Sequence, residues 1–187
     1  MHLETHRCAL VLIDIQEKLL AVMHNQEALL KGLNKITAGA KVLGIPILWN
    51  EQNPDRMGPT VASIQQILHP LRPLGKMHFS CCGNEDFMSE LESTGRDQIL
   101  LAGIETHVCV FQTAQQLIQQ HYNVQIVADA VSSRNPIDQD IALQRITHTA
   151  RLQQAQLSPL TTSESALFEL MQTADHPNFR DILKVIR

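Results

Sequence analysis

Three residues of this sequence could carry out chemistry together, and the most informative of them is Cys109. The apolar run at residues 99–102 is typical of a fully buried parallel strand, and Gly103 interrupts it. From about Val108 onward apolar residues recur at helical spacing, which predicts Cys109 in the first turn of a helix. Unpaired N–H groups and the positive end of the helix dipole would lower the pKa of its thiol there. The alternative is a small buried hydrophobe, as free cysteines usually are.

Asp14 and Lys76 are the other two candidates. Asp14 directly follows the unbroken apolar run of residues 8–13, which predicts a strand with this carboxylate at its carboxyl end. Lys76 follows a connection rich in Pro and lies between apolar neighbours in a short predicted strand. Taken singly, Asp14 is more typical of a cap or turn carboxylate, and Lys76 of a solvated surface charge. Their interest comes from the combination with Cys109.

These residues need elements that position them, and apolar runs alternate with helical periodicity along the chain. Alternation of this kind requires right-handed crossovers and predicts a mainly parallel sheet in an α/β fold. In a sheet of order 3-2-1-4-5-6, the first and fourth strands are neighbours at the switch point where ligands bind. Asp14 and Cys109 would meet there. The expected strands are residues 8–13, 45–49, 76–80, 99–102, 124–128 and 155–160.

The expected helices cover residues 27–43, 60–68, 84–92, 108–120, 137–152, 162–171 and a segment that starts at 177. In the helix over 137–152 we expect Ile141, Ile146 and Ala150 to face the core. Thr162 or Ser163 is expected to cap the next helix, and Asp175 the last one. No repeat, linker or low-complexity stretch interrupts the pattern, so residues 1–187 are predicted to form a single domain.

The composition excludes several classes of function. Hydrophobic residues make up 44% of the 187 and charged residues 18%, which is typical of a globular protein with a full core. The net charge of −4 includes no basic block, which argues against a nucleic-acid partner. No apolar run approaches the roughly 18 residues of a membrane helix, and residues 1–8 lack the pattern of a signal peptide. We therefore expect a cytoplasmic protein without a nucleic-acid or membrane partner.

Cysteine usage points away from disulfides and metals. Four cysteines in a chain of this size do not resemble a disulfide framework, and no Cys-x-x-Cys pair suggests zinc. Cys81 and Cys82 are adjacent, and a disulfide between them would be strained. We expect two free thiols, one of them packed inward. No metal and no cofactor is predicted.

The chain resembles the isochorismatase-like, or cysteine hydrolase, superfamily in three motifs that occur in the family's order. The resemblance spans residues 8–187, and a tail from residue 129 onward adds to it. The loop from Trp49 to Thr60 looks like that of isochorismatase-domain proteins without a settled substrate. The three motifs are Leu-Ile-Asp14-Ile-Gln16, Gly-Lys76-Met-His-Phe-Ser80 and Gly103-Ile-Glu-Thr-His-Val-Cys109-Val.

The resemblance implies a Rossmann-like three-layer α/β/α fold and a catalytic triad of Asp14, Lys76 and Cys109. In this triad Lys76 favours the thiolate, and Asp14 accepts the thiol proton as a general base. The thiolate attacks an acyl carbon to form a thioester, which water then hydrolyses. The family also implies an oxyanion hole made by the backbone N–H groups of Glu105 and Cys109, with a cis peptide bond between Ile104 and Glu105. The expected activity is cleavage of a C–N bond in a small amide, imide or ureido compound.

Two departures from family patterns narrow this expectation. Nicotinamidases of the superfamily carry an Asp-x-His-type metal cluster after the second strand, whereas residues 49–58 contain no histidine here. A metal is therefore not expected. Isochorismatases that cleave a vinyl ether lack the nucleophilic cysteine at the position of Cys109. A thiol at this position favours acyl transfer over ether cleavage.

Seven further residues are expected near a substrate pocket, because they lie on loops at one end of the sheet. Each has a structural alternative: Trp49 could fill the edge of the core, and His107 could cap an element or lie in solvent. Glu51 and Gln52 could hold their loop together instead of contacting substrate. The seven are Leu19, Trp49, Glu51, Gln52, His78, Thr106 and His107.

Two other functions stay open at this point. A catalytically idle family member would use Cys109 as a redox-sensing thiol, or would serve as an interaction scaffold. Vinyl-ether hydrolysis would survive the loss of Cys109. A homo-oligomer, a dimer or larger, is expected from the family and from apolar helical faces. Those faces include Leu117, Ile118, Phe179, Ile182, Leu183 and Val185.

Overall fold

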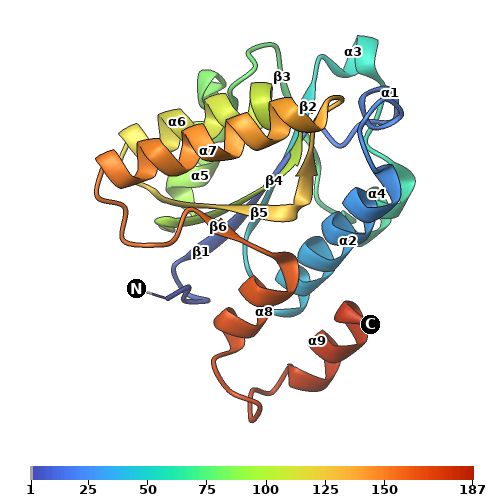
Figure 1. The fold of residues 1–187 in the computed structure, drawn as a ribbon. Coiled ribbons are helices and arrows are strands. Elements are labelled where there is room, and N and C mark those ends of the chain that lie inside the picture. Colours follow the sequence, from blue (N-terminus) through green and yellow to red (C-terminus); the bar gives the residue numbers. More distant parts are fainter. Residues whose placement is uncertain (1) are drawn as a thin grey trace.

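A single sheet of six parallel strands organises the computed structural model, which describes residues 2–187. The strand order is β3-β2-β1-β4-β5-β6, so the expected α/β class and strand order are confirmed. Helices α5, α6 and α7 cover one face, and α2, α8 and α9 lie on the other (Figure 1). The strands are β1 Cys8–Ile13, β2 Ile47–Gln52, β3 Leu74–Lys76, β4 Gln98–Ile104, β5 Asn123–Ser132 and β6 Leu160–Thr161.

The helices that connect these strands include two that periodicity did not predict. These are α1 and α3, of four residues each, which are too short for an apolar pattern to repeat. The complete set is α1 Glu17–Leu20, α2 Gln26–Val42, α3 Pro54–Met57, α4 Ala62–Leu68, η1 Cys81–Gly83, α5 Glu85–Ser93, η2 Thr106–Val110, α6 Phe111–Gln119, α7 Pro136–Leu152, α8 Ser163–Met171 and α9 Phe179–Ile186.

Several expected boundaries were wrong. The strand expected at 76–80 ends at Lys76, because β3 pairs only with the last three residues of β2. The edge strand expected at 155–160 is reduced to two residues. Helix α9 starts after Asn178, so Asp175 is not its cap, whereas Thr162 caps α8 as expected by accepting from the Ser165 N–H.

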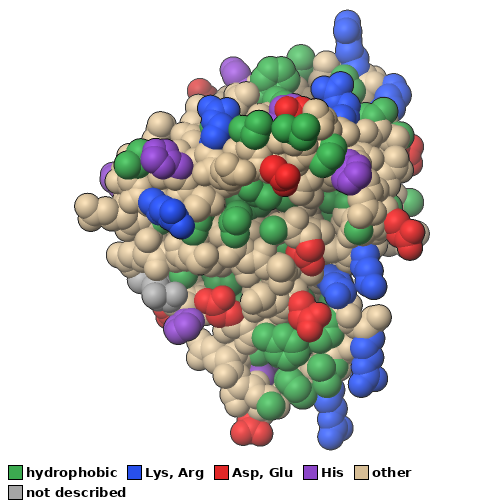
Figure 2. Space-filling model, in the orientation of Figure 1, with side chains coloured by type: hydrophobic (Ala, Val, Ile, Leu, Met, Phe, Trp, Pro, Cys, Tyr) green, Lys and Arg blue, Asp and Glu red, His purple; other side chains and the backbone are tan. Residues whose placement is uncertain are grey.

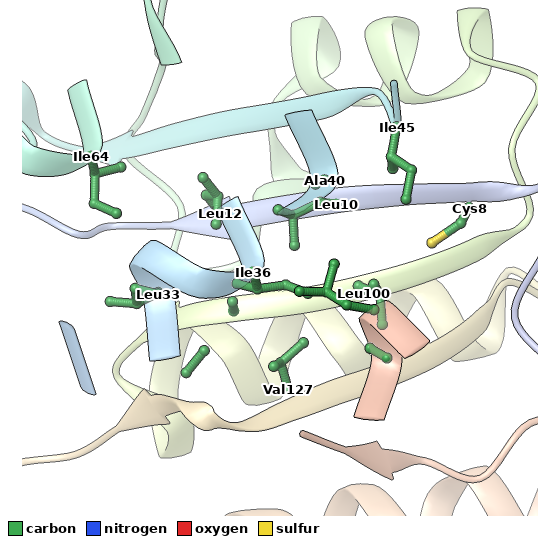
Figure 3. Packing of buried hydrophobic residues seen from close by; sticks show 14 of the residues in the cluster. Cys8, Leu10, Leu12, Leu33, Ile36, Ala40, Ile45, Ile64, Leu100 and Val127 are labelled. Atoms are coloured by element: carbon green, nitrogen blue, oxygen red, sulfur yellow. The ribbon is translucent and has the colours of Figure 1, made fainter. Parts of the chain in front are cut away.

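The core has two layers because residues alternate across buried strands. Strand β1 is inaccessible along its whole length; Leu10 and Leu12 face α2, whereas Ala9, Val11 and Ile13 face the opposite layer. Figure 3 shows Leu10 and Leu12 on β1 in the layer that also holds Leu33 and Ile36 of α2, with Leu100 on the adjacent β4 and Val127 on β5 beyond it. Because apolar residues cover both faces of the sheet at β1, polar side chains are found only at the two ends of this strand.

One inward assignment in α7 was wrong. Ile141 is 50% exposed, whereas Ala142, Ile146 and Ala150 form the buried stripe at a spacing of four residues. Ile141 lies one position off that stripe and so faces outward.

The apolar faces on which an oligomer was expected are largely covered within one chain. Leu117, Ile118 and Ile182 are buried, and Phe179 and Val185 pack against the core. Figure 2 shows green apolar side chains gathered over the region of α8 and α9, among charged residues. Self-association therefore stays a prediction, with different candidate residues. The large apolar side chains that are exposed are Val22, Leu71, Met77, Phe79, Ile137, Ile141, Leu152, Leu160 and Phe168.

No helix within residues 2–187 is both long and apolar enough to cross a membrane.

Candidate active site

The three chemical candidates come together at the carboxyl edge of the sheet. Asp14 follows β1 with a left-handed backbone (φ 55°), Lys76 is the last residue of β3, and Cys109 lies in η2, just after β4. Their relative exposures are 0%, 3% and 7%. Residues separated by up to 95 positions in the sequence are therefore neighbours, because parallel strands end at one edge.

The Lys76 ammonium group has four oxygen atoms within hydrogen-bond distance. Its Nζ donates to Asp14 Oδ2 at 2.8 Å and to Gln52 Oε1 at 2.7 Å. The carbonyl oxygens of Phe79 and His78 lie 3.0 and 3.3 Å away. Burial is the largest single influence and acts to lower the pKa of Lys76, but the charge and hydrogen bond of Asp14 together with the two nearby thiols, Cys109 and Cys81, outweigh it, so the pKa is raised. The site therefore keeps a fixed positive charge that acts on both Asp14 and Cys109.

The Asp14 carboxyl has one engaged oxygen and one that is open. Burial raises its pKa above the ordinary value, and the ammonium of Lys76 offsets part of that rise. Oδ1 is buried and makes no hydrogen bond of good geometry with any other group in residues 2–187. The Cys109 side chain lies close enough to interact with this carboxyl. Asp14 is thus a stronger base than an ordinary aspartate and has a free position for a proton.

The expectation of a lowered pKa for Cys109 was wrong. Burial raises the pKa of this thiol, the charge of Asp14 raises it further, and Lys76 offsets only part. Cys109 also lies within the π-helical turn η2, ahead of α6, and not in the first turn of an α-helix. A thiolate beside the Asp14 carboxylate would place two buried negative charges against one ammonium. Moving the proton from Cys109 to Asp14 leaves the net charge unchanged, so the two groups act as a coupled pair.

The backbone beside Cys109 has a cis peptide bond between Ile104 and Glu105, at the position that the family resemblance implies. The Glu105 carbonyl accepts from the N–H groups of Val108 and Val110 at 3.1 and 3.2 Å. The Glu105 carboxylate accepts from the N–H and Nε of Arg134, both at 3.1 Å. The N–H of Glu105 itself donates to no group among residues 2–187.

Three of the expected pocket residues are engaged within the protein. Trp49 Nε1 donates to Thr60 Oγ1 at 2.7 Å, and Thr60 donates to Glu51 Oε1 from its hydroxyl and its backbone N–H at 2.8 and 2.7 Å. Trp49 and Glu51 are both buried. Gln52 supplies an acceptor to Lys76, as given above. These contacts match the structural roles that were the alternative to substrate binding. Trp49 and Glu51 stabilise the loop that contains Thr60, and Gln52 binds the Lys76 ammonium group.

The other four expected pocket residues differ in their surroundings. Leu19 is half-buried and packs against the core, and His78 is exposed with its carbonyl directed at Lys76. His107 Nδ1 lies 2.9 Å from Ser133 Oγ. Thr106 is fully buried, and its hydroxyl has no hydrogen-bond partner among the described residues. Thr106, three positions before Cys109, is thus the one of the four with an open buried polar atom.

Sequence reasoning missed two polar residues that hold this site together. Gln16 is fully buried; its Nε2 donates to the carbonyls of Gln52 and Gly58 at 3.0 and 2.7 Å, and its Oε1 accepts from the Gln52 N–H at 2.8 Å. Thr113 Oγ1 donates to the Cys109 carbonyl at 2.7 Å. The signals were present: Gln16 belongs to the Asp14 motif, and Thr113 stands four residues after Cys109, where a helical hydroxyl bonds back.

Among residues 2–187, no three His, Cys, Asp or Glu side chains are grouped so that they could hold a metal ion.

Comparisons with known proteins identify the family of the chain. The model of the isochorismatase domain matches residues 8–164. Isochorismatase domain-containing protein 2 of Danio rerio is 35% identical, over 98% of this chain and 89% of its own length. The secreted isochorismatase effector Isc1 of Phytophthora sojae is 33% identical, over 97% of this chain and 85% of its own.

A solved structure described as the MAR1 ribonuclease of Caenorhabditis elegans superposes with a TM-score of 0.90. It is 30% identical to this chain and covers all of it, with 92% of that structure matched. The names of these relatives point to different activities, so shared ancestry indicates a hydrolase fold without indicating a substrate. Motif order, sheet topology and the domain match lead to one assignment: the chain belongs to the isochorismatase family.

Proposed function

We propose that this chain is a metal-independent cysteine hydrolase that cleaves the C–N bond of a small amide, imide or ureido compound. The observation that carries the proposal is the arrangement of Asp14. One of its oxygens is paired with Lys76 at 2.8 Å, the other is buried without a partner, and the carboxyl interacts with the Cys109 side chain. A scaffold or a structural ion pair has no need for an open buried oxygen next to a thiol.

The reaction begins with a proton transfer inside the site. Cys109 passes its proton to Asp14 Oδ1 as the sulfur attacks the carbonyl carbon, so no net charge is created in the buried site. Lys76 stays protonated and stabilises the negative charge that moves between the two groups. The raised pKa of Asp14 suits this role, because the carboxyl can both take the proton and return it.

The tetrahedral intermediate places negative charge on the former carbonyl oxygen. The open N–H of Glu105 and the N–H of Cys109 are the proposed donors to that oxygen. Collapse of the intermediate breaks the C–N bond, and Asp14 returns the proton to the leaving nitrogen. A water then attacks the thioester, with Asp14 as base, and regenerates the Cys109 thiol.

A panel of small primary amides, imides and ureido compounds tests the proposal, with intact-mass detection of an acylated protein at short times. Cys109→Ala should lower kcat/KM on any substrate found by on the order of 10⁴-fold or more, as loss of a nucleophile does. Asp14→Asn should lower it by about 10²- to 10⁴-fold, because the proton acceptor is lost. Cys82→Ala, which removes a half-buried thiol in η1, is the matched control and should keep wild-type rates.

Two results would contradict the proposal. Turnover that persists in Cys109→Ala would favour a reaction that needs no thiol, such as vinyl-ether hydrolysis. An acyl adduct mapped to a cysteine other than Cys109 would remove the assigned nucleophile.

A further inference from the structure

Cys81 is a second buried thiol near the site, and the proposed hydrolysis does not use it. It opens η1, five residues after Lys76, and has no accessible surface. It belongs to the same apolar cluster as Cys109, together with Val110 and Ala114. The adjacent Cys82 is only partly buried, so Cys81 is the one of these two thiols that the core encloses.

One hydroxyl group connects Cys81 to Cys109. Thr113 Oγ1 accepts from the Cys81 N–H at 3.0 Å and donates to the Cys109 carbonyl at 2.7 Å. The backbone nitrogen of Cys81 and the carbonyl oxygen of Cys109 therefore both lie within hydrogen-bond distance of the same hydroxyl oxygen. The backbones of the two cysteines are close to one another for this reason.

The charges of the site reach Cys81 as well. Burial raises the pKa of Cys81 to about 12, whereas Lys76 acts to lower it and Asp14 to raise it. A negative charge on Cys81 would also raise the pKa of the Cys109 thiol. Cys81 is thus a protonated thiol that is shielded from reagents in solution, and its backbone is linked to that of Cys109 through Thr113.

We propose that Cys81 is a resolving cysteine, which forms a reversible disulfide with Cys109 after a hydroperoxide has oxidised Cys109. This inference needs only a reactive Cys109 and goes beyond the proposed hydrolysis. The disulfide would block the nucleophile, and a thiol reductant would restore it.

The chemistry balances in two steps. The Cys109 sulfur attacks one oxygen of the hydroperoxide, the O–O bond breaks, and the thiol proton reaches the departing oxygen through Asp14. The products are a sulfenic acid on Cys109 and an alcohol, or water from hydrogen peroxide. The Cys81 sulfur then attacks the Cys109 sulfur, the S–O bond breaks, and the departing hydroxide takes the Cys81 proton to form water. Two thiols are oxidised, and one hydroperoxide is reduced.

The test is intact-mass and peptide mapping of the full chain after graded hydrogen peroxide, with iodoacetamide to block the remaining thiols. The wild type should lose two hydrogen atoms, give a linked peptide pair that contains Cys81 and Cys109, and return to its starting mass with dithiothreitol. Cys82→Ala, the matched control, should behave identically. Cys81→Ala should instead gain two or three oxygen atoms on Cys109 at several-fold lower peroxide, in a form that dithiothreitol does not reverse.

Three outcomes would overturn the inference. They are over-oxidation of Cys109 at the same peroxide dose in the wild type and in Cys81→Ala, a disulfide that joins Cys81 to Cys82, and oxidation of Cys82 with Cys109 untouched. If Cys81→Ala does not fold, Thr113→Val takes its place, because this variant keeps both thiols and removes the hydroxyl that links the two residues. The Cys81–Cys109 disulfide should then form more slowly than in the wild type, and an unchanged rate would count against the inference. Because the readout is mass, failure of the hydrolase proposal would leave this result interpretable.

Discussion

The two edges of the central strands each carry an ion pair, and the pairs are built in opposite ways. At the amino edge, Arg7 precedes β1 and Asp97 precedes β4, with Arg7 Nε 2.9 Å from Asp97 Oδ1 and a second guanidinium nitrogen 2.5 Å from Oδ2. The Asp97 side chain is 45% exposed. At the carboxyl edge, Lys76 and Asp14 form a pair whose side chains have no accessible surface.

This difference distinguishes a structural contact from the one that the proposed mechanism uses. At the amino edge, hydrogen bonding to Arg7 lowers the pKa of Asp97, and Asn123 donates to the same carboxylate, so the charges are stabilised. At the carboxyl edge, burial raises the pKa values of Asp14 and Cys109 and leaves Asp14 Oδ1 without a partner. A partly exposed ion pair such as Arg7–Asp97 stabilises the position of the strands. A buried carboxyl group that lacks one hydrogen-bond partner, such as Asp14, is available for proton transfer.

The largest expected effect comes from a comparison of two glycines, Gly95 ahead of β4 and Gly103 near the carboxyl end of that strand. Gly103 has φ 125°, and an added Cβ would lie 2.0 Å from the backbone oxygen of Ile13, whereas Gly95 has φ 64° with open space around that position. Gly103→Ala should destabilise the fold by about 4 kcal/mol or more, because backbone must move. Gly95→Ala should cost only about 1–2 kcal/mol for its left-handed conformation. Urea unfolding measures both, and equal midpoints would refute the distinction between the edges.

The two ion pairs should also respond differently to loss of the cation. Lys76→Met leaves Asp14 buried without a counter-charge, and we expect a loss of about 3–5 kcal/mol of unfolding free energy. Arg7→Met should shift the urea midpoint much less, because Asp97 is exposed and water can replace the guanidinium. The double variant Lys76→Met/Asp14→Leu should recover much of the stability without any activity. If the Arg7 variant proves the less stable one, the contrast fails.

The smallest expected effect is a pH dependence at the amino edge. The pKa of Asp97 is lower in the folded state than in the unfolded chain, where aspartate titrates near about 3.9. Its stabilising contribution is therefore complete above that pH and is lost as the pH falls toward the folded value. Asp97→Asn should flatten the fall of the thermal midpoint below about pH 4. Parallel midpoint curves for the variant and the wild type would show that other carboxylates govern acid unfolding.

Much of the architecture could be read from local pattern. The run at 8–13 became β1 with the same bounds, and the apolar residues 99–102 lie within β4. Elements that lack a repeating pattern, such as α1, or whose length depends on a partner strand, such as β3, could not be read in this way. Strand order followed from the alternation of elements and the handedness of crossovers.

The sequence by itself determined which residues gather at the carboxyl edge, because three motifs follow strands that must end there. Only the tertiary structure decided what those residues do to one another. The raised pKa of Cys109, the use of Gln52 to hold Lys76 and the link between Cys81 and Cys109 through Thr113 all depend on contacts across elements. Burial and the distances between charges set these properties, and neither exists until the chain is folded.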